Sequence, residues 1–483
     1  MMEKVYSNKK RRSFTFLIIS TCLLSSIFLI GLNKKENDTY KYPDCNVILI
    51  SIDSLRPDHL GCYRYHRNTS PHIDTIAQNS IIFENAFTHI PVTDPCLMTM
   101  LTSVYPSVHS INQPIVLNNN KVQTRRLSDS LVTLPQVLKK SGYTTSAFVN
   151  IDGTTGFDKG FDTYEQIEVL QWIVVAKYND KNFFVESELF KWIEKNQDNK
   201  FFLFSHTYAT HSPYISPDYT LYIDTYNGNI PSTYDEWKNM RTDSFDYFST
   251  VNESDKNDIQ HLINLYDGCI SYTDRQLGLL FRKLEELNLL RKTIIILMAD
   301  HGEEFHEHGG LTHGDLYIEH MHIPLIIKLP DNRAKRITCN VGLIDLVPTI
   351  LDLLDIKFKP KKYKFQGISL IPVIKEKVLT HDIYAEKIED EHNLCLCALR
   401  TKQWKYIENK DTNYSALFNI TSDPQEKHNV LSDYPRIAHA MHQKIKSFQN
   451  KNQKLKSKIK ESVVNIIFDE ETVERLRSLG YVK

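Results

Sequence analysis

The stretch TIIILMADHGEEFHEHGGLTHG, residues 293–314, decides the fold of this chain. Residues 293–298 are β-branched or aliphatic, and Asp300 and His301 follow almost at once. A short apolar run that ends in acids and glycine is typical of a buried strand in a parallel sheet. In open α/β sheets, ligands bind just beyond the carboxyl ends of such strands. An adjacent Asp and His at this point suit a divalent metal ion, although a polar loop around a hydrogen-bonded Asp has the same pattern.

The overall composition is that of a large globular protein. The 483 residues exceed what one hydrophobic core needs, which predicts a large domain and a smaller one. The net charge is −1, so no global field attracts nucleic acid, and no nucleic-acid partner is expected. The eight cysteines form no C-x-x-C pair, which argues against a zinc cluster.

The amino terminus has the features of a membrane anchor. Residues 1–12 contain five Lys and Arg, and residues 13–32 contain no charged residue. Twenty helical residues span roughly 30 Å, the thickness of a bilayer core. The basic flank predicts a cytoplasmic tail, a single transmembrane helix at 13–32, a linker at 33–42 and a body that is periplasmic, extracellular or lumenal. A cleaved signal peptide is the alternative, but no small-residue cleavage site follows the apolar run.

Two further strand ends carry polar residues. The run NVILISI, residues 46–52, is apolar and Asp53 follows it. An isolated Asp is more often a cap or turn residue, but two carboxylates at the ends of two strands can share a metal ion. Residues 201–204 form a third apolar run, and His206 and His211 come off its end. Two histidines within six residues at a strand end favour a functional site.

Thr93 precedes a predicted helix. The dipeptide Asp94-Pro95 predicts a helix N-cap and first helical residue, with the helix over residues 96–104. Thr93 would then face the positive end of that helix, where a hydroxyl near a metal loses its proton more easily and can act as an alkoxide nucleophile. From this segment alone, a capping Thr is the simpler interpretation.

The remaining segments predict a lid, a long helix and a second sheet. Residues 215–250 are rich in Tyr, Asp, Ser and Thr without a clear period, which suggests an insertion or lid near the site. Residues 256–289 have apolar residues at helical spacing. Residues 394–399 and 404–407 read as strands of a smaller antiparallel sheet.

Several segments together match one family. They are NVILISIDSLRPDHLGCY, TDPCLMTMLTSVYPSVHSIN, HTYATHSPY, YDGCISYTDRQLG, MADHGEEFHEHG with LTHGDLYIEHMHIPLII, and LRSLGYVK. The chain resembles the sulfatase and phosphodiesterase branch of the alkaline phosphatase superfamily over roughly residues 43–483. The resemblance implies a three-layer α/β/α core with a mostly parallel sheet and a small C-terminal antiparallel sheet. The expected division is a catalytic core at 43–375 and a C-terminal subdomain with a helical tail at 376–483.

The resemblance also implies a set of site residues. It predicts one divalent metal ion (Ca, Mn, Mg or Zn) bound by Asp53, Asp300 and His301, with the nucleophile Thr93 completing the site. Residues at three further positions would contact the transferred group or the leaving group: Asn112, His211 and His313. His206 matches a family position near the substrate, without a defined role.

One departure from the family concerns the nucleophile. Typical sulfatases carry C-x-P-x-R or S-x-P-x-R, whose Cys or Ser is oxidised to formylglycine, whereas this chain has Thr93 and ends the motif in Leu97. Oxidation of Thr would give a ketone rather than an aldehyde, so no formylglycine is expected.

The predicted function is metal-dependent hydrolysis of phosphate, phosphonate or sulfate esters through a covalent Thr93 intermediate. The expected partners are an anionic ester, such as a glycan or lipid head group, and the membrane through the N-terminal helix. The alternatives are a sulfatase without formylglycine, a phospho-group transferase acting on envelope glycans or lipids, and a catalytically silent scaffold.

Overall fold

The fold is taken from a computed structural model. It describes residues 39–111, 115–117, 121–151, 153–166, 188–222, 226–233, 235–237, 247–378, 381–390, 393–460 and 462–467. Residues 42–483 form one compact unit, so the finer division at residue 375 stays a prediction. Part of the predicted lid lies outside the described residues.

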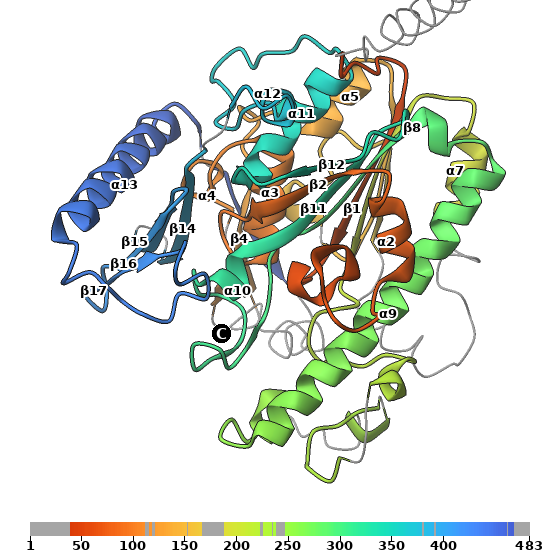
Figure 1. Cartoon of the computed structure of the whole chain (residues 1–483). Helices are drawn as coiled ribbons and strands as arrows, with labels where there is room; N and C mark the ends of the chain where they lie inside the picture. The colour runs from red at the N-terminus through yellow and green to blue at the C-terminus, as the bar shows by residue number, and fades with distance from the viewer. Residues whose placement is uncertain are drawn as a thin grey trace, which may run out of the picture. The chain divides into compact units, whose positions relative to one another are not determined.

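A nine-stranded sheet forms the centre of this unit, in the order β12-β2-β11-β8-β1-β7-β5-β6, with β13 also paired to β2. Figure 1 labels β12, β2, β11, β8 and β1 of this sheet. Five neighbouring strands run parallel: β8 (Thr293–Ala299), β1 (Asn46–Ile52), β7 (Phe201–Thr207), β5 (Thr144–Val149) and β6 (Thr163–Gln166). Every residue of β1, β7 and β8 is buried, which explains their continuous apolar runs. β11 (His322–Lys328) runs antiparallel to β8 and to β2 (Ile81–Phe87). The mostly parallel sheet predicted from the sequence is confirmed.

Helices cover both faces of the sheet, as expected for a three-layer core. On one side α9 (Lys256–Glu286) packs against α2 (Pro71–Ala77), and on the other α3 (Thr93–Thr102) packs against α5 (Leu134–Lys140) and α11 (Leu346–Leu353) (Figure 1). α3 begins at Thr93, three residues earlier than predicted, because Val92 and not Asp94 is its N-cap. Thr93 therefore lies inside the first helical turn.

The second sheet lies C-terminal, as predicted. Its four antiparallel strands are β14 (Ile383–Asp390), β15 (Asn393–Arg400), β16 (Trp404–Asn409) and β17 (Tyr414–Asn419), and α13 (Pro435–Lys456) packs on it. A third sheet has the order β18-β4-β3. The remaining strands are β3 (Ile115–Leu117), β4 (Lys121–Arg126), β9 (Glu304–Phe305), β10 (Leu311–Thr312), β12 (Lys335–Ile337), β13 (Val341–Gly342) and β18 (Ser462–Ile467). The shorter α-helices are α4 (Pro106–His109), α7 (Glu188–Asn196), α10 (Ile318–Met321) and α12 (Ile371–Ile374). The 3-10 turns are η1 (Pro57–His59), η2 (Gly61–Tyr63), η3 (Gly153–Thr155), η4 (Tyr219–Leu221), η5 (Tyr247–Thr250), η6 (Leu290–Lys292) and η7 (Leu343–Asp345).

The predicted localisation as a single-pass membrane protein requires correction. Within the part of the chain that the structure describes, no helix is both long enough and apolar enough to cross a bilayer. The segment that carried the prediction, residues 13–32, lies outside the described residues. The membrane assignment is therefore withdrawn.

Candidate active site

The aligned ends of β1 and β8 bring two carboxylates together. Ile52 pairs with Ala299 in the register of the two strands. Asp53 and Asp300 each follow directly, so they leave the sheet at the same edge. Both side chains are fully buried. The backbone N–H groups of Ser54 and His301 donate to Oδ1 of Asp300, at 3.2 Å and 2.9 Å. The turn after each strand thus fixes Asp300, and its Oδ2 has no hydrogen-bond partner within the described residues.

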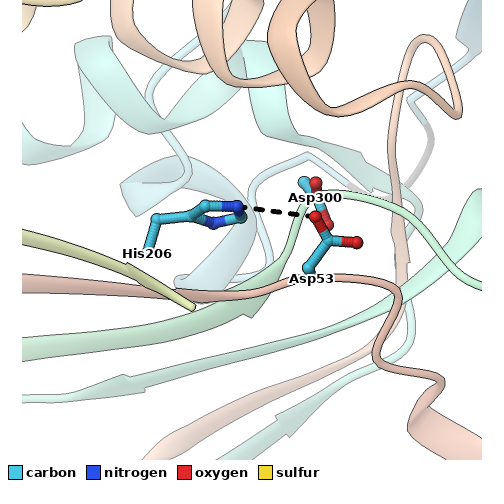
Figure 2. A group of neighbouring side chains, drawn as sticks. All are labelled: Asp53, His206 and Asp300. Atoms are coloured by element: carbon cyan, nitrogen blue, oxygen red, sulfur yellow. Dashed lines mark ion pairs between the residues drawn. The ribbon is translucent and has the colours of Figure 1, made fainter. Parts of the chain in front are cut away.

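His206 completes a three-residue group with these carboxylates (Figure 2). One ligand atom from each of Asp53, His206 and Asp300 lies within 4.8 Å of the other two. Nε2 of His206 is 3.5 Å from Oδ2 of Asp53, and neither ring nitrogen makes a hydrogen bond to a described residue. A buried O, N, O donor set with unsatisfied atoms fits a divalent metal ion. The sequence analysis placed His206 near the substrate, whereas the structure places it among the potential ligands.

His301 lies at the edge of this group. Its Nε2 is 3.8 Å from Oδ1 of Asp53 and 3.6 Å from Oδ2 of Asp300. Its Nδ1 lies 2.9 Å from the carbonyl oxygen of Gly302, and donation there leaves Nε2 as a free acceptor that faces the carboxylates. Gly302 itself is required by close packing, because a Cβ at this position would lie 2.0 Å from the carbonyl oxygen of Glu319. The predicted ligand role of His301 remains a proposal.

Thr93, at the start of α3, lies close to the carboxylate of Asp53. Its hydroxyl donates to Oδ2 of Asp53 at 3.2 Å and lies 3.4 Å from Nε2 of His301. The side chain is 1% exposed and belongs to the first turn of α3, where the helix dipole favours negative charge. The arrangement therefore brings a hydroxyl, a carboxylate and an imidazole together at a helix N-terminus.

Two more of the predicted residues lie beside this group. The ring of His313 is 4.2 Å from that of His301 and 5.3 Å from that of His211, measured between centroids. Nδ1 of His211 lies 2.6 Å from the carbonyl oxygen of Ser212. Asn112, the remaining predicted contact, lies outside the described residues.

Glu303 is a site residue that the sequence reasoning missed. Its Oε1 is 3.2 Å from Nδ1 of His313, and its side chain is fully buried. The other oxygen, Oε2, has no hydrogen-bond partner within the described residues. In sequence, Glu303 is one of several acids after β8; the available signal was its place in the loop that also carries His313.

The two buried carboxylates differ in their tendency to ionise. Burial works against ionisation of Asp53, but His206, His211 and His301 together hold its pKa below the usual range. Burial and the charge of Asp53 raise the pKa of Asp300. Burial and the neighbouring His301 lower the pKa of His313 to about 4. A cation between the carboxylates would remove the repulsion that raises the pKa of Asp300.

Comparison with protein families gives two matches along the chain. The model described as Sulfatase matches residues 45–356, and the model described as N-sulphoglucosamine sulphohydrolase, C-terminal, matches residues 306–451. Among characterised relatives, arylsulfatase K of Bos taurus is 26% identical over 463 residues, covering 85% of this chain and 82% of the relative. Arylsulfatase K of Homo sapiens is 24% identical over 484 residues, covering 89% and 87%.

Solved structures share the fold. The phosphonate monoester hydrolase of Agrobacterium radiobacter superposes with a TM-score of 0.67 at 18% identity, covering 84% of this chain and 96% of that chain. A structure solved with its substrate D-glucosamine-2-N,6-O-disulfate gives a TM-score of 0.64 at 17% identity, covering 85% and 98%. At these identities the likeness concerns the fold alone.

Proposed function

This chain belongs to the sulfatase family and is a sulfatase-like ester hydrolase, and we propose that Thr93 is its nucleophile. One observation carries the proposal: the Thr93 hydroxyl lies 3.2 Å from Asp53 and 3.4 Å from His301, at the first turn of α3. Sulfate esters are the proposed substrate class, in line with the arylsulfatase K relatives.

A divalent cation held by Asp53, His206 and Asp300, with His301 beside it, would lower the pKa of the Thr93 hydroxyl and neutralise charge on the transferred group. Ca, Mn, Mg and Zn all accept such a set of oxygen and imidazole ligands. The unsatisfied Oδ2 of Asp300 and ring nitrogens of His206 support this assignment.

The chain's own residues account for the proton transfers. The Thr93 hydroxyl gives its proton to Nε2 of His301, which lies 3.4 Å away, and its oxygen bonds to the sulfur of the ester. The bond from sulfur to the leaving oxygen breaks, and that oxygen takes a proton from His211 or His313. Water then attacks the sulfur of the Thr93 ester, releases the inorganic anion and restores the hydroxyl. The donors and acceptors for these steps are buried except His313, whose side chain is 17% exposed, and this burial favours a water-poor site.

Phosphate and phosphonate esters are the second candidate class, and the identity of residue 93 favours them. Formylglycine at this position would require Cys or Ser, and Thr has a β-methyl group that prevents formation of the aldehyde. The covalent ester must therefore be released by attack of water on the central atom. Phosphorus esters allow this attack readily, so a Thr nucleophile suits phosphoryl transfer as well as sulfuryl transfer.

The test compares substrates, metals and variants in the full-length chain. Aryl sulfates, phosphate monoesters, phosphate diesters and phosphonate esters are assayed with and without added divalent cations. Thr93→Ala is expected to lose about a thousandfold or more in kcat/KM, because no nucleophile remains. The matched control is Thr102→Ala, at the other end of α3, where the hydroxyl donates to the carbonyl of Met98.

Mass spectrometry of the quenched reaction is expected to find a sulfate or phosphate group on the peptide that contains Thr93. Full turnover by a correctly folded Thr93→Ala variant would contradict the proposal. The substrate that labels Thr93 decides between the two ester classes.

A further inference from the structure

A pocket of about 570 Å³ lies between α2, the C-terminal part of α9 and the end of β11. Lys328, at the end of β11, contributes to its wall and pairs with Ile295 near the start of β8. Asp300 follows the other end of β8, five residues beyond Ile295, so the pocket and the candidate active site lie about 17 Å apart along the sheet. The volume is in the range of small-molecule binding sites.

The lining of this pocket is rich in groups that donate hydrogen bonds. Three amides and three cations face it: Asn79, Asn288, Asn332, Arg282, Arg291 and Lys328. Glu285 is the one carboxylate in the lining. The pocket therefore carries a net positive charge and more donors than acceptors, which favours an anionic ligand.

Lys328 is a buried cation held at the pocket wall. It is 5% exposed, and its ammonium donates to the carbonyl oxygens of Leu290 and Leu329 at 3.0 Å and 3.3 Å. An ammonium has three protons, so two such bonds leave one donor without a carbonyl acceptor. Burial, and then the charge of Arg291, lower the pKa of Lys328. Lys328 and Arg291 both line the pocket, and an anion between them would relieve their repulsion.

The nearby acids do not neutralise these cations. No carboxylate in the described part of the chain forms an ion pair with Arg282 or Arg291. Asp331, whose charge reaches Lys328, is already engaged: its Oδ2 is 2.6 Å from Nε of Arg333 and 2.9 Å from the Tyr42 hydroxyl. Both guanidinium groups are thus available to a ligand.

We propose that this pocket binds a small organic oxyanion, namely a sugar that carries a sulfate or phosphate group. The guanidinium groups of Arg282 and Arg291 suit the oxyanion, because a planar fork of N–H donors binds such groups in a bidentate manner. The amides match sugar hydroxyls, and Phe281 offers an apolar surface for the ring. The proposal does not depend on the proposed function, because none of these residues belongs to the candidate active site.

Calorimetric titration of the full-length Thr93→Ala variant, which prevents turnover, tests this assignment. The probes are glucose 6-sulfate, glucose 6-phosphate, inorganic sulfate, inorganic phosphate and glucose. Adding Arg291→Gln or, separately, Arg282→Gln is expected to weaken binding of the sugar esters about tenfold, the loss typical of one charge-assisted contact. The matched control is Lys292→Gln, which makes the same change of charge one residue away and outside the lining.

Each outcome bears on the proposal. Unchanged affinity in both arginine variants would show that the ligand binds elsewhere. An equal loss in Lys292→Gln would show that the loss reflects overall charge and not a contact in the pocket. If glucose binds as tightly as its esters, the oxyanion is not recognised, and if inorganic anions bind as tightly as the esters, the sugar is not recognised. Turnover by the arginine variants in the wild-type background is expected to stay intact, so failure here is distinct from failure of the Thr93 mechanism.

Discussion

Glu303, which is fully buried, pairs with the partly buried His313, with Oε1 of Glu303 3.2 Å from Nδ1 of His313. Donation from Nδ1 to this carboxylate leaves Nε2 of His313 as the nitrogen available to the substrate side of the site. The charge of Glu303 also favours the protonated ring, against the burial and the His301 contact that lower the pKa of His313. Glu303 thus orients His313, which we propose as a proton donor to the leaving group.

The first prediction concerns the leaving group. Glu303→Gln is expected to lower kcat for alkyl esters about tenfold more than for p-nitrophenyl esters, because a good leaving group needs little protonation. The measurement is kcat for both substrates. The matched control is Glu304→Gln, the adjacent buried acid, which lies 2.9 Å from Nε2 of His320 and should change both rates by the same factor. If Glu303→Gln instead lowers kcat for both substrates by the same factor, as Glu304→Gln should, Glu303 has a structural role only.

The second prediction concerns the metal ion. Two fully buried carboxylates, Asp53 and Asp300, face each other across the proposed cation position, so the metal-free protein carries an unfavourable repulsion. Asp300→Asn is expected to raise the Tm of the chelated protein while abolishing the rise in Tm that added cation gives the wild type. Thermal unfolding with and without chelator checks both parts, and metal analysis should show loss of bound cation. A variant that still gains stability from cation would exclude Asp300 as a ligand.

The third prediction concerns the support behind Asp53. The hydroxyl of Tyr266, on α9, donates to the carbonyl of Ser54 at 2.7 Å and accepts from the N–H of Arg56 at 2.9 Å. Tyr266→Phe leaves both buried backbone groups unsatisfied and is expected to cost about 1–3 kcal/mol in the free energy of unfolding. Urea denaturation measures this loss, and kcat should fall as the turn at Asp53 loosens.

Tyr272→Phe is the control for that substitution. The Tyr272 hydroxyl, also buried on α9, has no hydrogen-bond partner within the described residues. Its removal should be nearly neutral. Equal destabilisation by the two variants would show that loss of the hydroxyl volume, rather than of the two hydrogen bonds, sets the cost.

The sequence predicted the parts of the site that strand ends determine. Asp53 and Asp300 follow continuous apolar runs, and the parallel register of β1 and β8 brings them to one edge as expected. Thr93 was predicted from the family resemblance, since its helix alone favours a capping role, and the helix starts earlier than predicted because Val92 supplies the cap. These inferences depend on local patterns that persist in the folded chain.

The sequence could not rank the histidines, because their distances depend on packing between distant segments. His206 pairs with Ser51 in the register of β1 and β7, which places it against Asp53, whereas His211 is five residues further along the loop. The partnership of Glu303 with His313 likewise depends on how the loop after β8 folds back, through the short pair of β9 and β10. β11 lies between β8 and β2 and runs antiparallel to both, and the apolar run 323–327 does not indicate this direction.

The fourth prediction concerns stability at acid pH and rests on His109. This histidine is 3% exposed; its Nε2 is 3.0 Å from the Thr99 hydroxyl, and its Nδ1 accepts from the N–H of Ile111 at 3.0 Å. Burial lowers its pKa to about 3, against a weaker opposing effect of the Pro95 carbonyl. A proton on Nδ1 would break the bond from Ile111, so the folded state keeps the ring neutral.

The sign of the pH effect follows from the difference between the pKa of His109 in the unfolded chain and in the folded chain. The unfolded chain protonates His109 near the ordinary pKa of about 6.5, whereas the folded chain does so only near 3, so the unfolded state binds more protons in between. The stabilisation is therefore complete above the unfolded pKa and is lost as the pH falls. Between pH 7.5 and pH 5 this one group should lower the free energy of unfolding by about 2 kcal/mol.

Urea denaturation of wild type and His109→Gln at both pH values measures this loss, since the variant lacks this contribution. His428→Gln, at a side chain that is 82% exposed, should keep the wild-type pH dependence. If His109→Gln loses as much stability as wild type over this range, the acid sensitivity comes from other groups.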